Sequence, residues 1–277
     1  MNDVVPYLAE RAKTLRRHVI EMIHRAGSGH PGGSLSAAEI IACLYFHEMR
    51  IDPAHPDWPD RDRFIMSKGH ACPVHYAALA ERGYFPVETL WTLRRLGSPL
   101  QGHPDMTKTR GLDMTAGSLG NGLPIGVGMA LGGRVQHRDF RIFVMLGDGE
   151  LQEGAAWEGA MAAAHYRLSS ITAIVDYNGL QVDGRVADIM QIAPLRAKWE
   201  GFDWDVTEID GHSIPQVLEA LERARQVADR PSVIIARTVK GKGVSFMENR
   251  VEWHGRAPNA EERDQALAEI EAAEAAA

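Results

Sequence analysis

The chain has 277 residues, of which 45% are hydrophobic and 24% are charged, and its formal net charge is −7. This composition is typical of a globular protein with a sizeable core, and the negative charge does not favour a nucleic-acid partner. Two cysteines, Cys43 and Cys72, are too few for a disulfide framework and fit a reducing compartment. The amino terminus has no signal-peptide pattern, and no apolar run approaches the roughly 20 residues that span a bilayer, so a cytoplasmic protein is expected.

Apolar periodicity along the chain predicts alternating helices and strands. Residues 8–23 have apolar side chains at helical spacing, and Ser36 with Glu39 has the pattern of a capping box that opens a helix over 36–46. The segment 120–136 predicts a buried helix whose glycines allow close packing. Further helices are expected over 73–82, 87–96, 152–166 and 214–228, and strands over 63–66, 142–146, 171–175, 206–209 and 232–237. We therefore expect an α/β fold with a doubly wound, mostly parallel sheet, in a single domain over residues 1–277 with a short Ala/Glu-rich tail.

Two polar side chains follow neighbouring strands of the predicted sheet. The strand over 142–146 ends at Gly147-Asp148-Gly149, and the strand over 171–175 is followed by Asn178. Because a helix connects these strands, they run parallel and end at the same edge of the sheet, where open α/β sheets bind ligands. A carboxylate and an amide oxygen at that edge suit a hard cation such as Mg²⁺, although Asp-Gly alone is common in turns.

Four of the twelve histidines share a local pattern, a glycine immediately before or a position at the loop end of a strand, and the sequence Gly-His-Pro occurs twice among them. They are His30 in SGHPGG, His70 in MSKGHA, His103 in QGHPD and His254 in EWHGRAP. A single loop histidine is usually a solvated polar residue, but proline fixes the backbone here and glycine allows close approach to a ligand. The long irregular stretch 97–117, which contains His103, is also typical of a functional loop. No histidine spacing for zinc is present.

These segments together resemble the motifs of transketolases, a family of thiamine diphosphate (ThDP)-dependent enzymes. The resemblance covers most of residues 10–260 and rests on the four histidine loops, on TAGSLGNG over 115–122 and on Gly-Asp-Gly followed by Asn178. These motifs occur in the family's order and at similar spacings. Ser118 stands where the family usually has proline, so this loop is expected to be less rigid.

The resemblance also implies roles for individual residues in binding ThDP. Asp148, Asn178 and the backbone carbonyl of Leu180 are expected to bind Mg²⁺, or Ca²⁺ or Mn²⁺ in its place. The other cofactor contacts implied by the resemblance are Gly149, His70 and His254 near the diphosphate and Gly117 and Leu119 against the aminopyrimidine ring.

The catalytic groups implied by the resemblance are His30, His103 and His254. His30 and His103 face the substrate and are suited to moving protons, because imidazole titrates near neutrality. Glu153 matches a family glutamate at a contact between subunits, although an acid is also favoured there by the helix dipole. Lys240 and Lys242 follow the last strand and are either phosphate-binding or solvated.

The resemblance is limited to the first of the three domains of a full-length transketolase. The implied protein is the amino-terminal subunit of a two-chain transketolase, active with a separate carboxyl-terminal subunit that carries the pyrimidine-binding domain and its catalytic glutamate, in an α2β2 heterotetramer. It would transfer a two-carbon ketol unit from a ketose or ketose phosphate to an aldose.

Other functions remain open at this point. They are a different ThDP enzyme, such as a 1-deoxyxylulose-5-phosphate synthase or a dehydrogenase E1 component; a split transketolase for a branched or sulfonated sugar; and a non-catalytic module that kept the fold. The two Gly-His-Pro loops and the His254 loop favour transketolase over the other ThDP enzymes. A dinucleotide loop at Gly126-Val127-Gly128 is not supported, because no strand precedes it.

Overall fold

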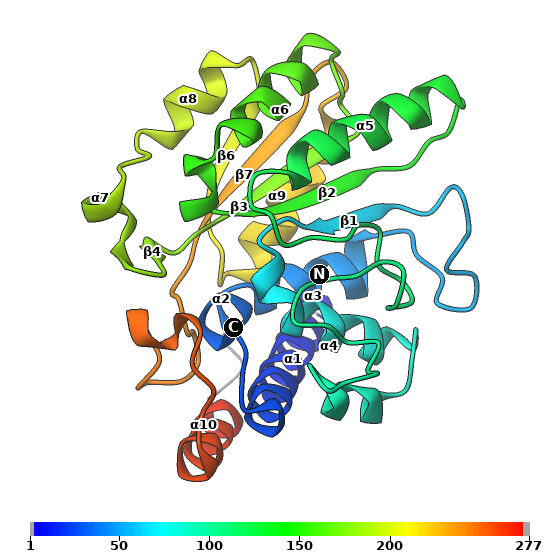
Figure 1. Cartoon of the computed structure of the whole chain (residues 1–277). Coiled ribbons are helices and arrows are strands. Elements are labelled where there is room, and N and C mark those ends of the chain that lie inside the picture. The colour runs from blue at the N-terminus through cyan, green and yellow to red at the C-terminus, as the bar shows by residue number, and fades with distance from the viewer. Residues whose placement is uncertain (1–2, 274–277) are drawn as a thin grey trace.

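The computed structural model describes residues 3–273 and is built around a five-stranded sheet. The strand order is β1-β2-β3-β7-β6, and every neighbouring pair is parallel. The strands are β1 (Arg63–Met66), β2 (Ile142–Gly147), β3 (Ile171–Tyr177), β6 (Asp205–Asp210) and β7 (Ser232–Arg237). Helices cover both faces of this sheet (Figure 1), which confirms the predicted doubly wound, parallel α/β fold.

Alternate residues of each strand belong to two different hydrophobic cores, one on each face of the sheet. In β2, Val144 packs into one core, whereas Phe143 and Met145 pack into the other. This follows from the two-residue period of a strand, and it explains why strands buried on both faces read as continuous apolar runs.

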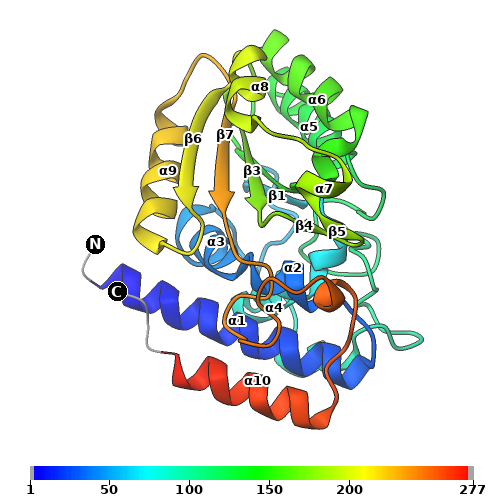
Figure 2. The same ribbon diagram turned by 90° about the vertical axis from the view of Figure 1, so that its left-hand side faces the viewer.

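The first core lies between the sheet and the helices α5 (Gly122–Val135), α6 (Gly154–His165) and α8 (Leu195–Gly201). The second lies under α1 (Val4–Ala26), α3 (Ala38–Cys43), α4 (Cys72–Arg82), α9 (Ile214–Gln226) and α10 (Ala260–Ala272). Figure 2 shows α10 lying along α1 on the outside of this second layer. Among residues 3–273, no helix combines the length and apolarity needed to cross a membrane.

The predicted capping box at Ser36 and Glu39 is wrong. Ser36 instead follows the short helix α2 (Pro31–Leu35), and the backbone is already helical at Ala37, which precedes α3. The Ser36 hydroxyl donates to Asp176 Oδ2 at 2.7 Å and also lies 3.2 Å from the Gly33 carbonyl, and Glu39 pairs with an arginine. Both side chains are therefore used in tertiary contacts that the local sequence does not reveal.

Two other helix predictions need correction. Over 87–96, only Val87–Thr92 is helical, and it is a 3₁₀ helix. Helix α5 is buried on one face only: Gly126 and Gly133 pack closely against Val144 and Phe140, whereas Gly128 has open space around it. Residues 97–117 contain no helix or strand, as expected.

The remaining elements are short or lie at the carboxyl end. A hairpin of β4 (Leu180–Gln181) and β5 (Gly184–Arg185) leads into α7 (Val186–Ile189). Helix α10 begins with a capping box between Asn259 and Glu262. The Ala/Glu-rich tail over 268–277 is helical as far as Ala272, and residues 274–277 lie outside the described part of the chain.

Candidate active site at the carboxyl edge of the sheet

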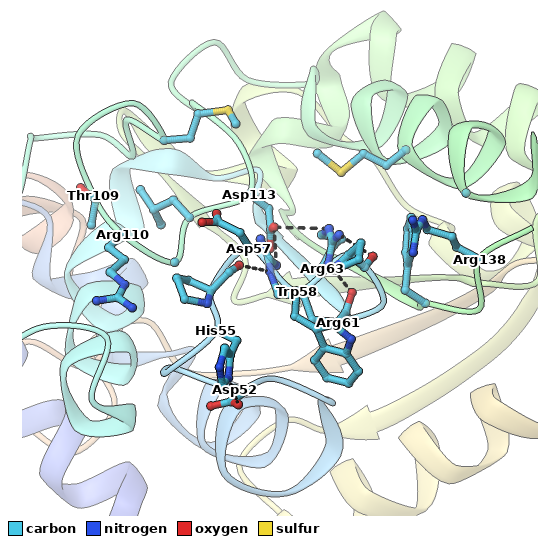
Figure 3. Close-up of a pocket in the computed structure, with 18 of the residues that line it drawn as sticks. Asp52, His55, Asp57, Trp58, Arg61, Arg63, Thr109, Arg110, Asp113 and Arg138 are labelled. Atoms are coloured by element: carbon cyan, nitrogen blue, oxygen red, sulfur yellow. Dashed lines mark hydrogen bonds and ion pairs between the residues drawn. The ribbon is translucent and has the colours of Figure 1, made fainter. Parts of the chain in front are cut away.

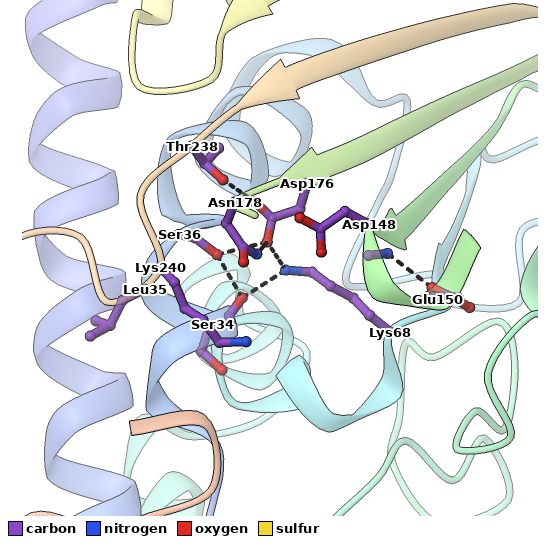
Figure 4. Close-up of polar contacts among 12 residues, drawn as sticks. Ser34, Leu35, Ser36, Lys68, Asp148, Glu150, Asp176, Asn178, Thr238 and Lys240 are labelled. Carbon is purple, nitrogen blue, oxygen red and sulfur yellow. Dashed lines mark hydrogen bonds and ion pairs between the residues drawn. The ribbon is translucent and has the colours of Figure 1, made fainter. Parts of the chain in front are cut away.

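A cavity of about 210 Å³ lies where β2 and β3 end, next to the turn that follows β1 and the loop that follows β7. Figure 4 shows polar side chains from these elements gathered at one place. Of the predicted site residues, the cavity is lined by His70, Leu119, Asp148, Gly149, Asn178, Leu180 and His254. The fold thus brings together residues that are far apart in the sequence.

The carboxylate of Asp148 is held at the start of the turn after β2. Its Oδ1 accepts a hydrogen bond from Gly149 N at 2.7 Å, and its Oδ2 accepts one from Gly179 N at 2.5 Å. Burial and the neighbouring Asp176 carboxylate raise the pKa of Asp148 to about 6. A bound cation would offset both effects, so this position suits a metal ligand.

Asn178 and Leu180 place two further oxygen atoms at this cavity. Asn178 Nδ2 donates to Asp176 Oδ2 at 3.0 Å, and Asn178 Oδ1 accepts from Leu180 N at 3.1 Å. The Leu180 carbonyl accepts from Lys240 Nζ at 2.9 Å. Across residues 3–273, no group of three or more His, Cys, Asp or Glu side chains is arranged to hold a metal. A cation here would therefore use one carboxylate, one amide, one carbonyl and oxygens from elsewhere, which fits Mg²⁺ with a phosphate.

Asp176 is a central residue of the site that the sequence analysis missed. Its carboxylate is fully buried and accepts hydrogen bonds from Lys68 Nζ at 2.5 Å, Ser36 Oγ at 2.7 Å, Asn178 Nδ2 and the Thr238 hydroxyl. Burial raises the pKa of Asp176, but the Lys68 ammonium outweighs this and holds it below its usual value. Asp176 therefore stays ionised and fixes the amide orientation of Asn178.

The sequence contains a signal for Asp176 and for its partner Lys68, neither of which the sequence analysis singled out. Lys68 belongs to the MSKGHA motif, and Asp176 stands two positions before Asn178 at the end of an apolar strand. A charged residue at the end of a buried strand needs a partner of opposite charge. The sequence, however, does not say which lysine or arginine provides it.

Lys240 is a buried residue that lines the cavity, and its interpretation as a solvated lysine is wrong. It is only 2% exposed, and its Nζ contacts the Leu180 carbonyl and His254 Nδ1, both at 2.9 Å. Burial lowers its pKa to about 8, against the opposing pull of the carboxylates. Lys242 differs: it is partly exposed and lies 3.5 Å from Glu248, beside a separate small cavity.

The four loop histidines lie close to one another in the folded chain. The ring centroid of His30 lies 5.4 Å from that of His70, 6.1 Å from that of His103 and 5.5 Å from that of His254. Burial, with help from nearby cations, lowers the pKa of His30 to about 4 and that of His254 to about 3, and it also lowers the pKa values of His70 and His103. The four rings are therefore neutral near pH 7, and each can donate one hydrogen bond and accept another.

The loop with Gly117 and Leu119 lies over the cavity. A Cβ at Gly117 would lie 3.7 Å from His103, and one at Gly69 would lie 3.0 Å from the Gly117 backbone nitrogen. The turn that carries His70 and this loop are thus in close contact. Glu153, which is exposed, also lines the cavity near Leu119.

Arg94 is a further residue that the sequence analysis did not single out. Its Nη2 lies 3.4 Å from His30 Nδ1 and 3.3 Å from the Gly102 carbonyl, and its Nη1 donates to Ser28 Oγ at 3.0 Å. It therefore joins the loops that carry His30 and His103. Nothing in its local sequence distinguishes it from a surface arginine.

A larger cavity of about 1470 Å³ lies elsewhere, next to the amino end of β1 (Figure 3). It contains none of the predicted site residues. The buried carboxylate of Asp113 in its wall is already paired with Arg61 at 2.6 Å and with the backbone N–H of Phe64 at 2.9 Å. The buried charge of Asp113 is therefore balanced by partners within the fold.

Comparison with known proteins agrees with the motifs. Residues 8–271 match the family described as transketolase, thiamine diphosphate binding domain. The chain is 46% identical to a 6-deoxy-6-sulfo-D-fructose transketolase subunit of Clostridium sp. (strain MSTE9), over 95% of this chain and 96% of that protein. It is 41% identical to an apulose-4-phosphate transketolase subunit of Actinobacillus succinogenes, over 95% of each chain.

Solved structures give the same answer. Transketolase from Campylobacter jejuni superimposes on the chain with a TM-score of 0.90 and 31% identity, over 95% of this chain and 42% of that one. The chain thus spans about two-fifths of the length of that transketolase. The similarity drawn from the sequence motifs is therefore confirmed. The chain belongs to the transketolase family and carries its thiamine diphosphate-binding domain.

Proposed function

We propose that the chain is one subunit of a two-chain transketolase that transfers a two-carbon ketol unit from a ketose to an aldose. The main support is the arrangement at the sheet edge, where Asp148, Asn178 and Leu180 oxygens lie beside a buried lysine and a cluster of neutral histidines. Relatives that match over nearly their whole length are named as subunits, which supports a separate partner chain.

The residues at this edge fit ThDP and a divalent cation. Asp148, Asn178 and the Leu180 carbonyl would hold Mg²⁺, or Ca²⁺ or Mn²⁺, together with the diphosphate. Gly149, His70 and His254 would contact the diphosphate, and Gly117 and Leu119 would lie against the aminopyrimidine ring. Bound ThDP supplies a nucleophilic carbon for breaking and forming carbon–carbon bonds next to a carbonyl group.

His30, His103 and His254 would act on the substrate's protons. Their low pKa values leave them neutral, so His30 and His103 each have an unprotonated ring nitrogen that can receive a proton from a sugar hydroxyl and return it readily. His254 Nδ1 accepts a hydrogen bond from the Lys240 ammonium, so the proton of the neutral ring is on Nε2, which would donate a hydrogen bond to a substrate oxygen. Arg94 beside His30 disfavours a second positive charge there, which favours a fast return of the proton.

The partner is a carboxyl-terminal transketolase subunit with the pyrimidine-binding domain, in an α2β2 assembly. The chain then acts as a single domain, and exposed Glu153 at the cavity mouth would meet a neighbouring chain. Location in the cytoplasm fits the reducing compartment that the two buried, unpaired cysteines favour.

The similarities favour a particular substrate class within this proposal. The matched subunits are named for 6-deoxy-6-sulfo-D-fructose and for apulose-4-phosphate, which carry a sulfonate and a phosphate group. We therefore include such sugars as candidate donors beside the common ketose phosphates.

Reconstitution with the partner tests this function. The two purified chains, with ThDP and Mg²⁺, are expected to transfer ketol units from at least one ketose in a panel of common, branched and sulfonated donors, whereas neither chain alone should do so. The control is a pair reconstituted with the Asp148→Ala variant of this chain, which should be inactive. Transfer by the chain alone would refute the need for a partner, and a reconstituted pair that binds no ThDP by calorimetry would favour a non-catalytic module.

A further inference from the structure

The loop over residues 238–243 carries Lys240 from the end of β7 into the cofactor cavity. There the Lys240 ammonium contacts the Leu180 carbonyl and His254. Lysine is a long, flexible side chain, so its ammonium stays in place only if its backbone is held. The Gly241 N–H donates to the Gly32 carbonyl at 3.0 Å, which fixes the middle of the loop.

His212 holds the loop at Val239. It lies in the turn between β6 and α9, and its Nε2 accepts a hydrogen bond from Val239 N at 2.8 Å. On the other side of the ring, Nδ1 lies 3.0 Å from Glu39 Oε2. Because a backbone N–H can only donate, Nε2 must be the unprotonated nitrogen, and Nδ1 therefore carries the proton and donates it to Glu39.

Arg16 and Glu39 support the ring from behind and also reach the end of the loop. Arg16 Nη1 and Nη2 donate to the two Glu39 carboxylate oxygens at 2.6 and 2.7 Å, and Arg16 Nε donates to the Lys242 carbonyl at 3.0 Å. Burial raises the pKa of Glu39, but Arg16 and His212 outweigh it and lower it to about 2. The charged pair and the ring thus hold both Val239 and Lys242, the two residues that flank Lys240 and Gly241.

We propose that His212 is a positioning residue of the cofactor site, which holds the Val239 backbone so that Lys240 stays inside the cavity. His212 itself does not line that cavity, so its effect on the cofactor passes through the loop. The inference rests on the proposed function for its effect on ThDP, whereas the anchoring of the loop is measurable without any ligand.

Two amide variants separate the two hydrogen bonds of the ring. The His212→Gln amide reaches the position of Nε2 and can still accept from Val239, whereas the His212→Asn amide ends near Nδ1 and can only reach Glu39. Hydrogen exchange of the full chain without ligand should show about tenfold faster exchange over residues 238–243 in His212→Asn. In His212→Gln, exchange there should stay within about threefold of the parent chain.

The reconstituted pair gives the functional measurement. His212→Asn should raise the apparent Kd for ThDP with Mg²⁺ about tenfold and leave kcat at saturating ThDP within about twofold. His212→Gln should restore the affinity. A matched control is His18→Asn, because His18 also pairs with a glutamate, Glu81, at 2.8 Å and with similar exposure, but on α1 away from the loop.

The outcomes decide the two proposals separately. Equal exchange in the Asn and Gln variants, whether unchanged or accelerated, would overturn the anchoring role, because the Val239 hydrogen bond would then not matter. If exchange separates the two variants but the parent pair binds no ThDP, the anchoring role stands and the proposed function fails. An affinity loss in His18→Asn equal to that in His212→Asn would show a general loss of stability and overturn the positioning role.

Discussion

Lys68 and Asp176 form a buried ion pair at the proposed cofactor cavity, with 2.5 Å between Lys68 Nζ and Asp176 Oδ2. The two side chains are 2% and 0% exposed, and they come from the turn after β1 and from the end of β3. Lys68 also donates to the Gly33 carbonyl, so the pair ties three segments together. The carboxylate in turn orients Asn178, so this pair links the stability of the fold to the geometry of the proposed metal site (Figure 4).

The first prediction concerns this pair. Lys68→Met should lower the free energy of unfolding by about 3–5 kcal/mol, because it leaves the Asp176 carboxylate buried and unpaired. The double variant Lys68→Met with Asp176→Asn should recover at least half of that loss, since no uncompensated charge remains. Urea unfolding followed by circular dichroism measures both. A double variant no more stable than Lys68→Met would contradict the charge-based explanation.

The second prediction concerns Asp148. Asp148→Asn should weaken ThDP binding in the presence of Mg²⁺ by about 100-fold, a loss of ~2.7 kcal/mol, because an amide is a poor substitute for a charged magnesium ligand. The unfolding midpoint of the ligand-free chain should change little, because the lost hydrogen bond is offset by relief of repulsion from Asp176. Titration calorimetry of the reconstituted pair measures the affinity.

The hairpin between β4 and β5 offers a matched control for the Asp148→Asn substitution. Asp183→Asn changes an exposed acid in the hairpin between β4 and β5 and should leave ThDP affinity unchanged. Equal losses in the two variants would indicate a general effect of charge on the diphosphate rather than a metal site at Asp148.

The third prediction concerns the pH dependence of stability. His75 is buried, its Nε2 bonds Tyr45 Oη at 2.6 Å and its Nδ1 has no hydrogen-bond partner within the described residues. Burial lowers the pKa of His75 from 6.5 to about 3. Between these values the unfolded chain binds a proton that the folded chain does not, so stability is lost as the pH falls from 6.5 towards 3. The expected slope is about 1.4 kcal/mol per pH unit for each such histidine.

Two substitutions isolate this contribution. His75→Phe should reduce the slope of unfolding free energy against pH, measured by urea unfolding between pH 5 and 6.5, by about one proton. Tyr45→Phe removes the hydroxyl partner but keeps the histidine, so its curve should stay parallel to that of the parent chain. A His75→Phe curve parallel to the parent curve would show that His75 does not contribute.

The fourth prediction concerns a glycine beside the site. A Cβ at Gly122, the first residue of α5, would overlap the Ser67 side chain and lie 3.0 Å from its Cα. Ser67 Oγ donates to Glu150 and accepts from Gly122 N at 3.2 Å, so it cannot move freely. Gly122→Ala should therefore cost about 1–3 kcal/mol of stability.

Gly128 in the same helix is the control, because a Cβ there would meet open space, so Gly128→Ala should stabilise the chain by up to about 1 kcal/mol. Thermal unfolding of the two variants checks the difference, and a shift of equal sign in both would contradict the packing argument.

The sequence by itself predicted the parts of the site that depend on local structure. Asp148 and Asn178 each follow a buried strand, and the periodicity of β2, α6 and β3 predicts a parallel unit that ends both strands at one edge. The loop histidines were recognised because glycine and proline shape the backbone around them. These are properties of a few consecutive residues, so the sequence contains them.

Tertiary structure decided which polar groups pair inside the protein. Lys68 and Asp176 are 108 positions apart, and Ser36 bonds Asp176 from 140 positions away, instead of capping its own helix. Lys240 is buried against Leu180 although its local sequence is typical of a solvated loop. A buried polar group must find a partner, but any nearby segment of suitable chemistry can provide it. Which segment does so depends on how the helices pack on the sheet, and this is why Asp176, Lys68 and His212 emerged only from the folded chain.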